Sequence, residues 1–370
     1  MKITDVTITL FAWDDLPARQ FGRHTGKMAG GRSELGLVAI HTDQGVEGHA
    51  FLGSSSRGAN FDAASLITFL KPLLIGQNPL DRERLYQQMW ARNRNTTLRC
   101  IGAVDVALWD LAGKVAGLPI HRMLGSFRES IPAYASSEVL PSMEAYAEEA
   151  MRIKAAGFHA YKIHPPAVWQ QDIKICRHVR EAVGGDYRLM LDSTWSYSYP
   201  EALRVGRALE DLGYYWYEDP LDADDITNYV KLRQKLDIPI LATEYAPGGF
   251  QALAPWLTMQ ATDFLRGDVA VKGGITALVK IAHLAEAFHM NLEVHHGGNS
   301  LNNVANVHVI MAIANTEYFE VLLPDSTQKY GLAQDLVVEP DGHVRPPQGP
   351  GLGARIDVDL IQRKKTAVLR

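Results

Sequence analysis

Alternating hydrophobic and polar positions divide the chain near residue 125 into two unlike parts. In the first part, the segments 2–13 and 33–51 alternate apolar and polar residues and are rich in β-branched side chains, which predicts strands. Asp43-Gln44-Gly45 predicts a hairpin turn within the second segment. Helical periodicity follows near 60–75, 81–94 and 99–117. Strands first and helices afterwards predict an α+β domain at residues 1–125.

From about residue 126 the pattern changes to a regular alternation of strands and helices. The predicted strands end near Val139, His164, Asp192, Glu218, Glu244, Asp268, His296 and Leu323. Eight strands with intervening helical segments predict an α/β fold, a TIM-like (β/α) barrel at residues 126–328. The Gly- and Pro-rich segment 329–370 lacks this periodicity, and we expect it to pack back on the first domain.

Three acidic residues close three successive predicted strands at a constant interval. Asp192, Glu218 and Glu244 are each 26 residues apart, which is enough chain for one strand, one helix and two short loops. Their side chains therefore emerge at the same end of the barrel and converge. Three carboxylates at one point repel one another unless a cation lies between them. The spacing predicts a site for a hard divalent metal, Mg²⁺ above all.

Further polar residues stand at the neighbouring strand ends. Lys162 and His164 point to the same side of the second barrel strand, because side chains alternate along a strand. Asp268 ends the sixth strand, and His295 and His296 end the seventh. An aspartate on an adjacent strand fixes the tautomer of a histidine and raises its basicity. Alternation lets only one of the two histidines face inward.

The eighth strand offers two acidic residues for the same end of the barrel. Glu320 and Glu317 compete for this position, and we favour Glu320. Trp195, just beyond the first predicted metal ligand, forms either an apolar wall of the binding site or part of the packing of the barrel rim.

Composition narrows the class of protein. Hydrophobic residues make up 46% of the chain and charged residues 21%, as in soluble globular proteins. A net charge of −5 provides no basic surface for nucleic acid or an anionic membrane, and no apolar run approaches the length of a membrane span. Cys100 and Cys176 are too few for a disulfide framework, and the N-terminal segment lacks a signal sequence. We expect a cytoplasmic protein without nucleic-acid or membrane partners.

On the basis of these residues and of the motifs below, the chain resembles the mandelate racemase and muconate-lactonizing enzyme group of the enolase superfamily over nearly its whole length. The segment 102–120 (GAVDVALWDLAGKVAGLPI) resembles the helix that joins the capping domain to the barrel in that group. Glu218-Asp219-Pro220 and Asp268 with the following 272–276 (KGGIT) resemble its fourth- and sixth-strand motifs. The resemblance implies a (β/α)₇β barrel, an α+β capping domain formed by the N-terminal region and the C-terminal tail, and one Mg²⁺ essential for catalysis.

The resemblance also implies roles for single residues. The metal ligands match Asp192, Glu218 and Glu244. The catalytic Asp–His dyad matches Asp268 and His295, with His296 as the alternative.

The remaining roles include two departures from the group's pattern. Glu320 matches the glutamate that hydrogen-bonds the substrate carboxylate, and it needs a raised pKa if it is to donate a proton there. Members like mandelate racemase have Lys-x-Lys on the second strand, whereas this chain has Lys162-Ile163-His164. Thr194 stands where asparagine is common, two residues after the first ligand.

The resemblance implies removal of the proton beside a carboxylate, the step that the group shares. Histidine needs little tuning to act as the base near neutrality. If His295 and His164 act as base and acid on a leaving β-oxygen, the reaction is dehydration. Return of a proton to carbon is racemisation or epimerisation, and expulsion of a ring oxygen is cycloisomerisation. A non-catalytic sugar-acid binding protein is a remote alternative. We favour a Mg²⁺-dependent acid-sugar dehydratase that forms a 2-keto-3-deoxy acid.

Substrate specificity in this family comes from loops of the capping domain. The loop 14–31 contains basic residues, hydroxyl groups and several glycines, which suits a lid over a polyhydroxylated acid. We predict that Arg23, His24, Trp195 and His296 contact a small sugar-acid substrate. The family habit further suggests a symmetric homo-oligomer.

Overall fold

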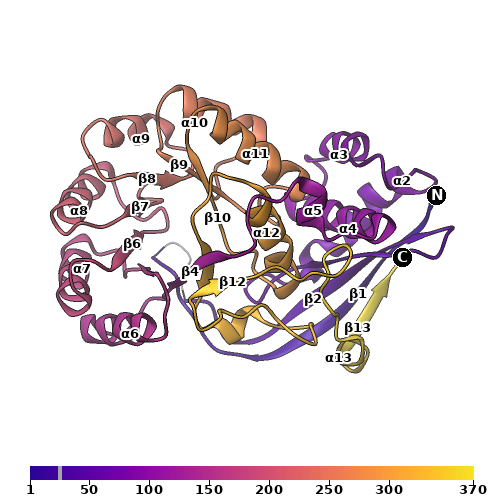
Figure 1. Cartoon of the computed structure of the whole chain (residues 1–370), viewed down its shortest axis with the longest axis horizontal. Helices are drawn as coiled ribbons and strands as arrows, with labels where there is room; N and C mark the ends of the chain where they lie inside the picture. Colours follow the sequence, from indigo (N-terminus) through magenta and orange to yellow (C-terminus); the bar gives the residue numbers. More distant parts are fainter. Residues whose placement is uncertain (24–26) are drawn as a thin grey trace.

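The computed structural model describes residues 1–23 and 27–370 as a barrel with a second sheet at one side (Figure 1). The predicted substrate contact His24 lies outside the described residues. The chain order is a sheet-forming N-terminal segment, then helices, then a strand–helix alternation, as the hydrophobic pattern predicted.

The barrel is built from eight parallel strands in the order β10-β9-β8-β7-β6-β5-β4-β11. The strands are β4 (Ile131–Ser136), β5 (Ala160–Ile163), β6 (Arg188–Asp192), β7 (Trp216–Glu218), β8 (Ile240–Ala242), β9 (Phe264–Gly267), β10 (Asn291–Val294) and β11 (Phe319–Leu322). Among the described residues no strand ladder joins β10 to β11, so the barrel is nearly closed. A backbone hydrogen bond from Leu292 N to Asn315 O (2.9 Å) links the two segments there.

Helices cover the outside of the barrel (Figure 1). They are α6 (Met143–Ala155), α7 (Trp169–Val183), α8 (Tyr199–Asp211), α9 (Ile226–Arg233), α10 (Ala254–Thr258), α11 (Ile275–Ala287) and α12 (Ser300–Ala312). The sequence sets their starts locally. At α8, for example, Ser198 and Glu201 form a capping box that satisfies the first free backbone N–H groups.

Large side chains fill the barrel interior below the candidate site. Tyr134, Met190, Trp216, Leu241 and Tyr318 form a separate buried cluster there, with Ala160 completing it. Strand alternation produces this cluster, because every second side chain points inward. The functional side chains above therefore stand on a packed, rigid layer.

The second sheet is antiparallel and has the order β13-β1-β2-β3. Its strands are β1 (Ile3–Leu16), β2 (Gly31–Thr42), β3 (Gly48–Leu52) and β13 (Lys365–Leu369). The C-terminal tail thus pairs with the first strand of the chain, and both ends of the chain lie on this side of the molecule (Figure 1). The predicted fold, a barrel with a capping domain made from both ends of the chain, is confirmed. The boundaries 125/126 and 328/329 stay predictions.

One helix joins the cap to the barrel. α4 (Leu98–Ala116) begins at Thr97, whose side chain accepts a hydrogen bond from Cys100 N. A Cβ at Gly102 would lie 2.3 Å from the Val269 carbonyl oxygen, so only glycine allows the helix this close to the barrel. One turn on, Asp105 accepts hydrogen bonds from the Thr276 backbone N–H (2.9 Å) and hydroxyl (2.6 Å).

Two predictions from the sequence concern membrane spans and disulfide bonds. No helix of the described residues is both long and apolar enough to cross a membrane. Cys100 and Cys176 are buried and free. The homo-oligomer stays a prediction.

Candidate active site

The three evenly spaced carboxylates meet at the carboxyl end of the barrel strands. Asp192, Glu218 and Glu244 each offer one oxygen, and these oxygens all lie within 4.8 Å of one another. All three residues are buried. The convergence predicted from the 26-residue interval is therefore present.

Glu244 reaches this point only because the backbone breaks the strand alternation. Leu241 packs in the barrel interior, so alternation would direct Thr243 inward and Glu244 outward. Thr243 instead has φ +90°, a conformation that non-glycine residues rarely adopt. Its hydroxyl donates to Arg266 O (3.1 Å) and accepts from Arg266 N (3.0 Å), which fixes the turn that aims Glu244 at the other two carboxylates.

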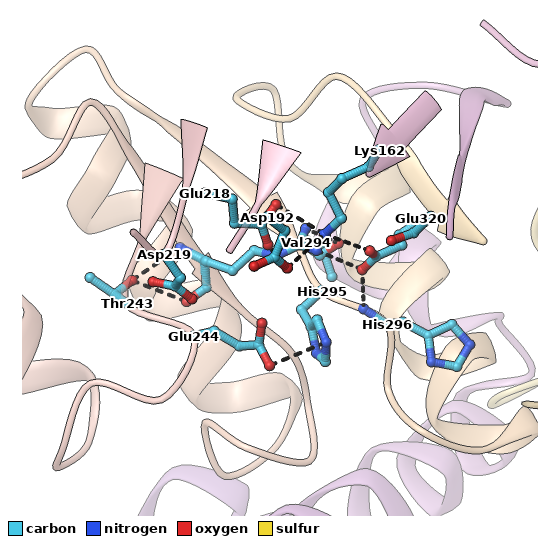
Figure 2. A network of polar contacts seen from close by, with 12 residues as sticks. Lys162, Asp192, Glu218, Asp219, Thr243, Glu244, Val294, His295, His296 and Glu320 are labelled. Carbon is cyan, nitrogen blue, oxygen red and sulfur yellow. Dashed lines mark hydrogen bonds and ion pairs between the residues drawn. The ribbon is translucent and has the colours of Figure 1, made fainter. Parts of the chain in front are cut away.

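Lys162 is the central cation of this end of the cavity. Its side chain is 1% exposed, and its Nζ lies 2.9 Å from Glu218, 2.8 Å from Glu320 and 3.4 Å from Asp192 (Figure 2). Glu320, not Glu317, thus occupies the site, since Glu317 pairs with Arg188 at the barrel's exposed rim. The lysine predicted beside the metal ligands is in contact with two of them.

A second buried cation was missed by the sequence analysis. Arg266 is 0% exposed, and its guanidinium lies 2.8 Å from Glu218 Oε1 and 2.6 Å from Glu320 Oε2. It also donates to the Tyr134 hydroxyl (3.0 Å). Arg266 precedes Asp268 by two residues, so strand alternation alone would have placed it on the inward face.

These buried cations decide the direction in which the pKa of Glu320 is shifted. Burial alone would raise the pKa of Glu320, but the positive charges of Arg266, Lys162 and His295 outweigh burial and lower that pKa well below its usual range. Glu320 is therefore ionised and accepts hydrogen bonds, including one from His296 N (3.0 Å). The raised pKa that proton donation by Glu320 would require is therefore not found.

His164 faces the carboxylates from the β5 side. Its Nε2 lies 2.9 Å from Asp192 Oδ2, and its Nδ1 lies 2.7 Å from the Ser137 carbonyl oxygen. Because a carbonyl oxygen only accepts, Nδ1 carries a hydrogen, and Nε2 is the nitrogen that can exchange a proton.

His295 faces the carboxylates from the opposite side, after β10. Its Nδ1 contacts Asp268 Oδ2. Its Nε2 lies 3.3 Å from Glu244 Oε1, as Figure 2 shows. Burial acts to lower the pKa of His295, but the negative charges of Glu244 and Asp268 raise it to about 9. The Asp–His contact places a proton on Nδ1 and again leaves Nε2 directed at the site.

His296 turns away from the carboxylates (Figure 2). Its Nδ1 accepts from Gly298 N (3.0 Å), and its Nε2 lies 2.6 Å from the Asn303 side-chain nitrogen. Burial lowers its pKa to about 3, so the ring is uncharged at neutral pH. Of the two candidate histidines, His295 is thus the one in contact with Asp268.

A cavity of about 260 Å³ opens above these groups between barrel and cap. This volume lies just below the range of about 300–1,000 Å³ typical of small-molecule sites. Trp195 and His296 line the cavity, and their contact with a substrate stays a prediction. Arg23 is exposed and is not among the residues that line it, whereas Arg19, four residues earlier, does line it.

The cap closes tightly on the barrel at the unusual Thr194. The backbone N–H of Thr194 donates to Asp192 Oδ1 (2.9 Å) and so orients the first carboxylate. A Cβ at Gly22 (φ +150°) would lie 1.7 Å from Thr194 Oγ1, so a glycine is required in the cap loop at this point.

The donor set fits a divalent metal ion. Arg266 Nε lies at ion-pair distance from Glu218 Oε1, but neither atom makes a hydrogen bond, which leaves a buried carboxylate oxygen of the triad free to bind a cation. Three carboxylate oxygens are hard ligands of the kind that Mg²⁺ prefers. Asp192, Glu218 and Glu244 are the residues that would hold it.

Comparison with protein families agrees with this geometry. Residues 7–125 match the mandelate racemase/muconate lactonizing enzyme N-terminal domain, and residues 145–360 match the enolase C-terminal domain-like family. The chain belongs to the mandelate racemase/muconate lactonizing enzyme group of the enolase superfamily. The resemblance read from the sequence motifs is thus confirmed.

Relatives in this group include dehydratases and a cycloisomerase. The arabinonate dehydratase of Saccharolobus solfataricus is 30% identical over 350 residues, covering 90% of this chain and 91% of that protein. The D-galactarolactone cycloisomerase of Agrobacterium fabrum is 28% identical over 343 residues, covering 88% and 89%.

Solved structures in the group share the whole fold. The D-glucarate dehydratase of Agrobacterium tumefaciens, crystallised with magnesium, is 34% identical with a TM-score of 0.88, covering 99% of this chain and 100% of that chain. The 3,6-anhydro-D-galactonate cycloisomerase of Zobellia galactanivorans is 27% identical with a TM-score of 0.84, covering 99% and 100%.

Proposed function

We propose that this enzyme is a Mg²⁺-dependent acid-sugar dehydratase. The observation that carries the proposal is the pair of imidazoles, His164 and His295, whose Nε2 atoms face the carboxylate triad from opposite sides. Dehydration needs a base for the α-proton and an acid for the departing β-oxygen, and the two histidines can supply both. Several relatives are named as acid-sugar dehydratases, which supports this reaction type.

The metal would supply one element of the chemistry. Bound Mg²⁺ stabilises the negative charge that develops on the substrate carboxylate when the α-proton leaves. Lys162 contacts Asp192, Glu218 and Glu320, and Arg266 contacts Glu218 and Glu320, which holds these carboxylates in place. Lys162 is also placed to donate to a substrate carboxylate oxygen.

The chain's own residues then carry the proton transfers. One histidine takes the α-proton on Nε2, and the electron pair of the broken C–H bond moves onto the carboxylate. The other histidine gives its Nε2 proton to the β-hydroxyl as the C–O bond breaks, so that water leaves. The enol that remains tautomerises to a 2-keto-3-deoxy acid. Asp268 acts as a positioning residue that fixes the tautomer of His295.

A second candidate is cycloisomerisation, favoured by the two cycloisomerases among the relatives. The same two histidines would serve, with a ring oxygen as the leaving group in place of water. Mass distinguishes the two reactions, because dehydration removes water and cycloisomerisation leaves the mass unchanged.

The test is a screen of acid sugars and their lactones with Mg²⁺ and with EDTA, read by keto-acid formation and product mass. We expect turnover with Mg²⁺ and none with EDTA. His164→Asn and His295→Asn should each abolish turnover, while one of them retains deuterium exchange at the α-carbon in D₂O. The exposed His283 on α11 provides the matched control, and His283→Asn should behave as wild type. Absence of both turnover and α-deuterium exchange for every compound would refute the proposal.

A further inference from the structure

A buried arginine lines the cavity at the cap side without an acidic partner. Arg19 is 4% exposed, and its guanidinium donates to the hydroxyls of Thr327 (2.8 Å) and Ser55 (2.9 Å). Its Nε is buried and makes no hydrogen bond. Within the described residues Arg19 forms no ion pair with an acidic side chain, although Glu138 is near enough to affect its pKa.

Burial of a charge without a counter-ion is costly. Burial lowers the pKa of Arg19, and the more distant Glu138 only partly opposes this effect. Proteins retain a buried cation where a partner of opposite charge compensates it. Two neutral hydroxyls orient the guanidinium but do not neutralise it, and Glu138 compensates it only in part, which leaves the guanidinium open to a bound anion.

The guanidinium is held ready for such a molecule. The backbone of Arg19 is fixed by paired hydrogen bonds with the backbone of Met28 (3.1 and 2.8 Å). Thr327, which accepts from the guanidinium, lies in the short 3₁₀ helix η4 (Asp325–Gln328) that follows β11. A guanidinium has five N–H groups, of which two are used here, and the Nε–H is among those left over. This leaves donors for a carboxylate, which arginine binds in a bidentate manner.

The other arginines that line the cavity have partners. Arg57 makes a bidentate pair with Asp62 (2.9 and 3.0 Å), and the half-buried Arg99 donates to the Tyr245 hydroxyl (3.1 Å). Arg19 is therefore the cation of the cavity's cap side that is both buried and short of a negative charge.

We propose that the substrate carries a second carboxylate, at the end away from the metal ligands, and that Arg19 binds it. The enzyme would then act on dicarboxylic acid sugars or their lactones in preference to monocarboxylic ones. The statement about which substrates are turned over rests on the proposed function, whereas the binding of a second carboxylate by Arg19 does not depend on it. It goes beyond the relatives, whose names include both monocarboxylic and dicarboxylic acid sugars.

The test compares matched pairs of ligands on the full chain with Mg²⁺. Calorimetry measures binding of D-glucarate against D-gluconate and of galactarate against D-galactonate, and kcat/KM is measured for any that turn over. We expect the dicarboxylate of at least one pair to bind about 10- to 100-fold more tightly, the usual effect of a charge-assisted hydrogen-bonded pair. Arg19→Met should remove this preference through Kd and KM, and Arg19→Lys should restore part of it. Arg32→Met, an exposed arginine of the same domain, is the control for net charge.

Each outcome decides a separate question. Equal or weaker binding of the dicarboxylates, or a preference that survives in Arg19→Met, would overturn the inference even if turnover is normal. Tighter binding of 6-phospho-D-gluconate than of D-glucarate would assign the site to a phosphate and overturn it as well. Arg19-dependent dicarboxylate binding without any turnover would support the inference while refuting the proposed dehydratase.

Discussion

The buried cations at the two ends of the cavity differ in their partners. At the metal end, Lys162 and Arg266 are fully buried and each contacts two or more carboxylates. At the cap end, Arg19 is buried to a similar degree, but its partners among the described residues are two hydroxyls and the ring of Phe21. A buried charge with good partners stabilises the protein's own structure, whereas one without them is available to a ligand. The contrast distinguishes cations that build the site from the one that we assign to recognition.

The largest effect is expected for Lys162→Ala. This variant removes the cation between Glu218 and Glu320 and should lower kcat/KM at least about 1,000-fold, because preorganised charge next to the reacting carboxylate is lost. Steady-state kinetics measures the loss, and circular dichroism checks the fold. Lys231→Ala, at an exposed lysine of α9, should be fully active. Normal turnover in Lys162→Ala would remove this lysine from the mechanism.

Arg266→Met tests whether the paired cations hold the structure together. Glu218 and Glu320 would each lose a buried partner, and we expect the free energy of unfolding to fall by about 3–5 kcal/mol. Urea denaturation without Mg²⁺ measures it. Arg122 forms an exposed pair with Glu129 and supplies the control, since Arg122→Met should cost under about 1 kcal/mol. Equal losses in both variants would contradict the contrast between buried and exposed pairs.

Glu293, in the barrel interior beneath the metal end, tests the cost of a buried charge with a carboxylate in place of a cation. Burial raises its pKa to about 7 from the ordinary 4.5. A raised pKa means that the folded state binds the proton more tightly, so this group stabilises the fold below about pH 4.5 and loses that contribution as pH rises to about 7. The difference in unfolding free energy between wild type and Glu293→Gln should therefore change by roughly 3 kcal/mol over this interval. A difference independent of pH would show that Glu293 is ionised throughout.

The smallest effect is expected for Arg19→Met in the absence of ligand. Loss of two hydroxyl hydrogen bonds is offset by relief of an uncompensated charge, so unfolding free energy should change by less than about 1 kcal/mol. Thermal denaturation of the ligand-free variant beside Arg266→Met measures the contrast directly. A large loss of stability would mean that Arg19 belongs with the structural cations.

Much of the barrel could be predicted because its signals are local. The 26-residue interval between Asp192, Glu218 and Glu244 and the alternation along β5 depend only on strand periodicity. Arg266 was within reach of the same reasoning, since it stands two residues before Asp268.

The cap end could not be predicted in this way. Arg19 lies in an irregular segment, and its position depends on Thr327, 308 residues away in the sequence. No periodicity connects such distant positions. The composition of the loop led us to predict that Arg23, not Arg19, contacts the substrate. The direction of Glu244 likewise depends on the positive φ of Thr243, which strand alternation does not foresee.

The pairing of β13 with β1 has a consequence for biosynthesis. β13 is translated only after every strand of the barrel, whereas its partner β1 is translated before all of them. The outer edge of β1 therefore stays uncovered throughout translation of the barrel, and exposed strand edges invite pairing with other chains. Nascent chains of this protein should depend on chaperones chiefly to shield that edge.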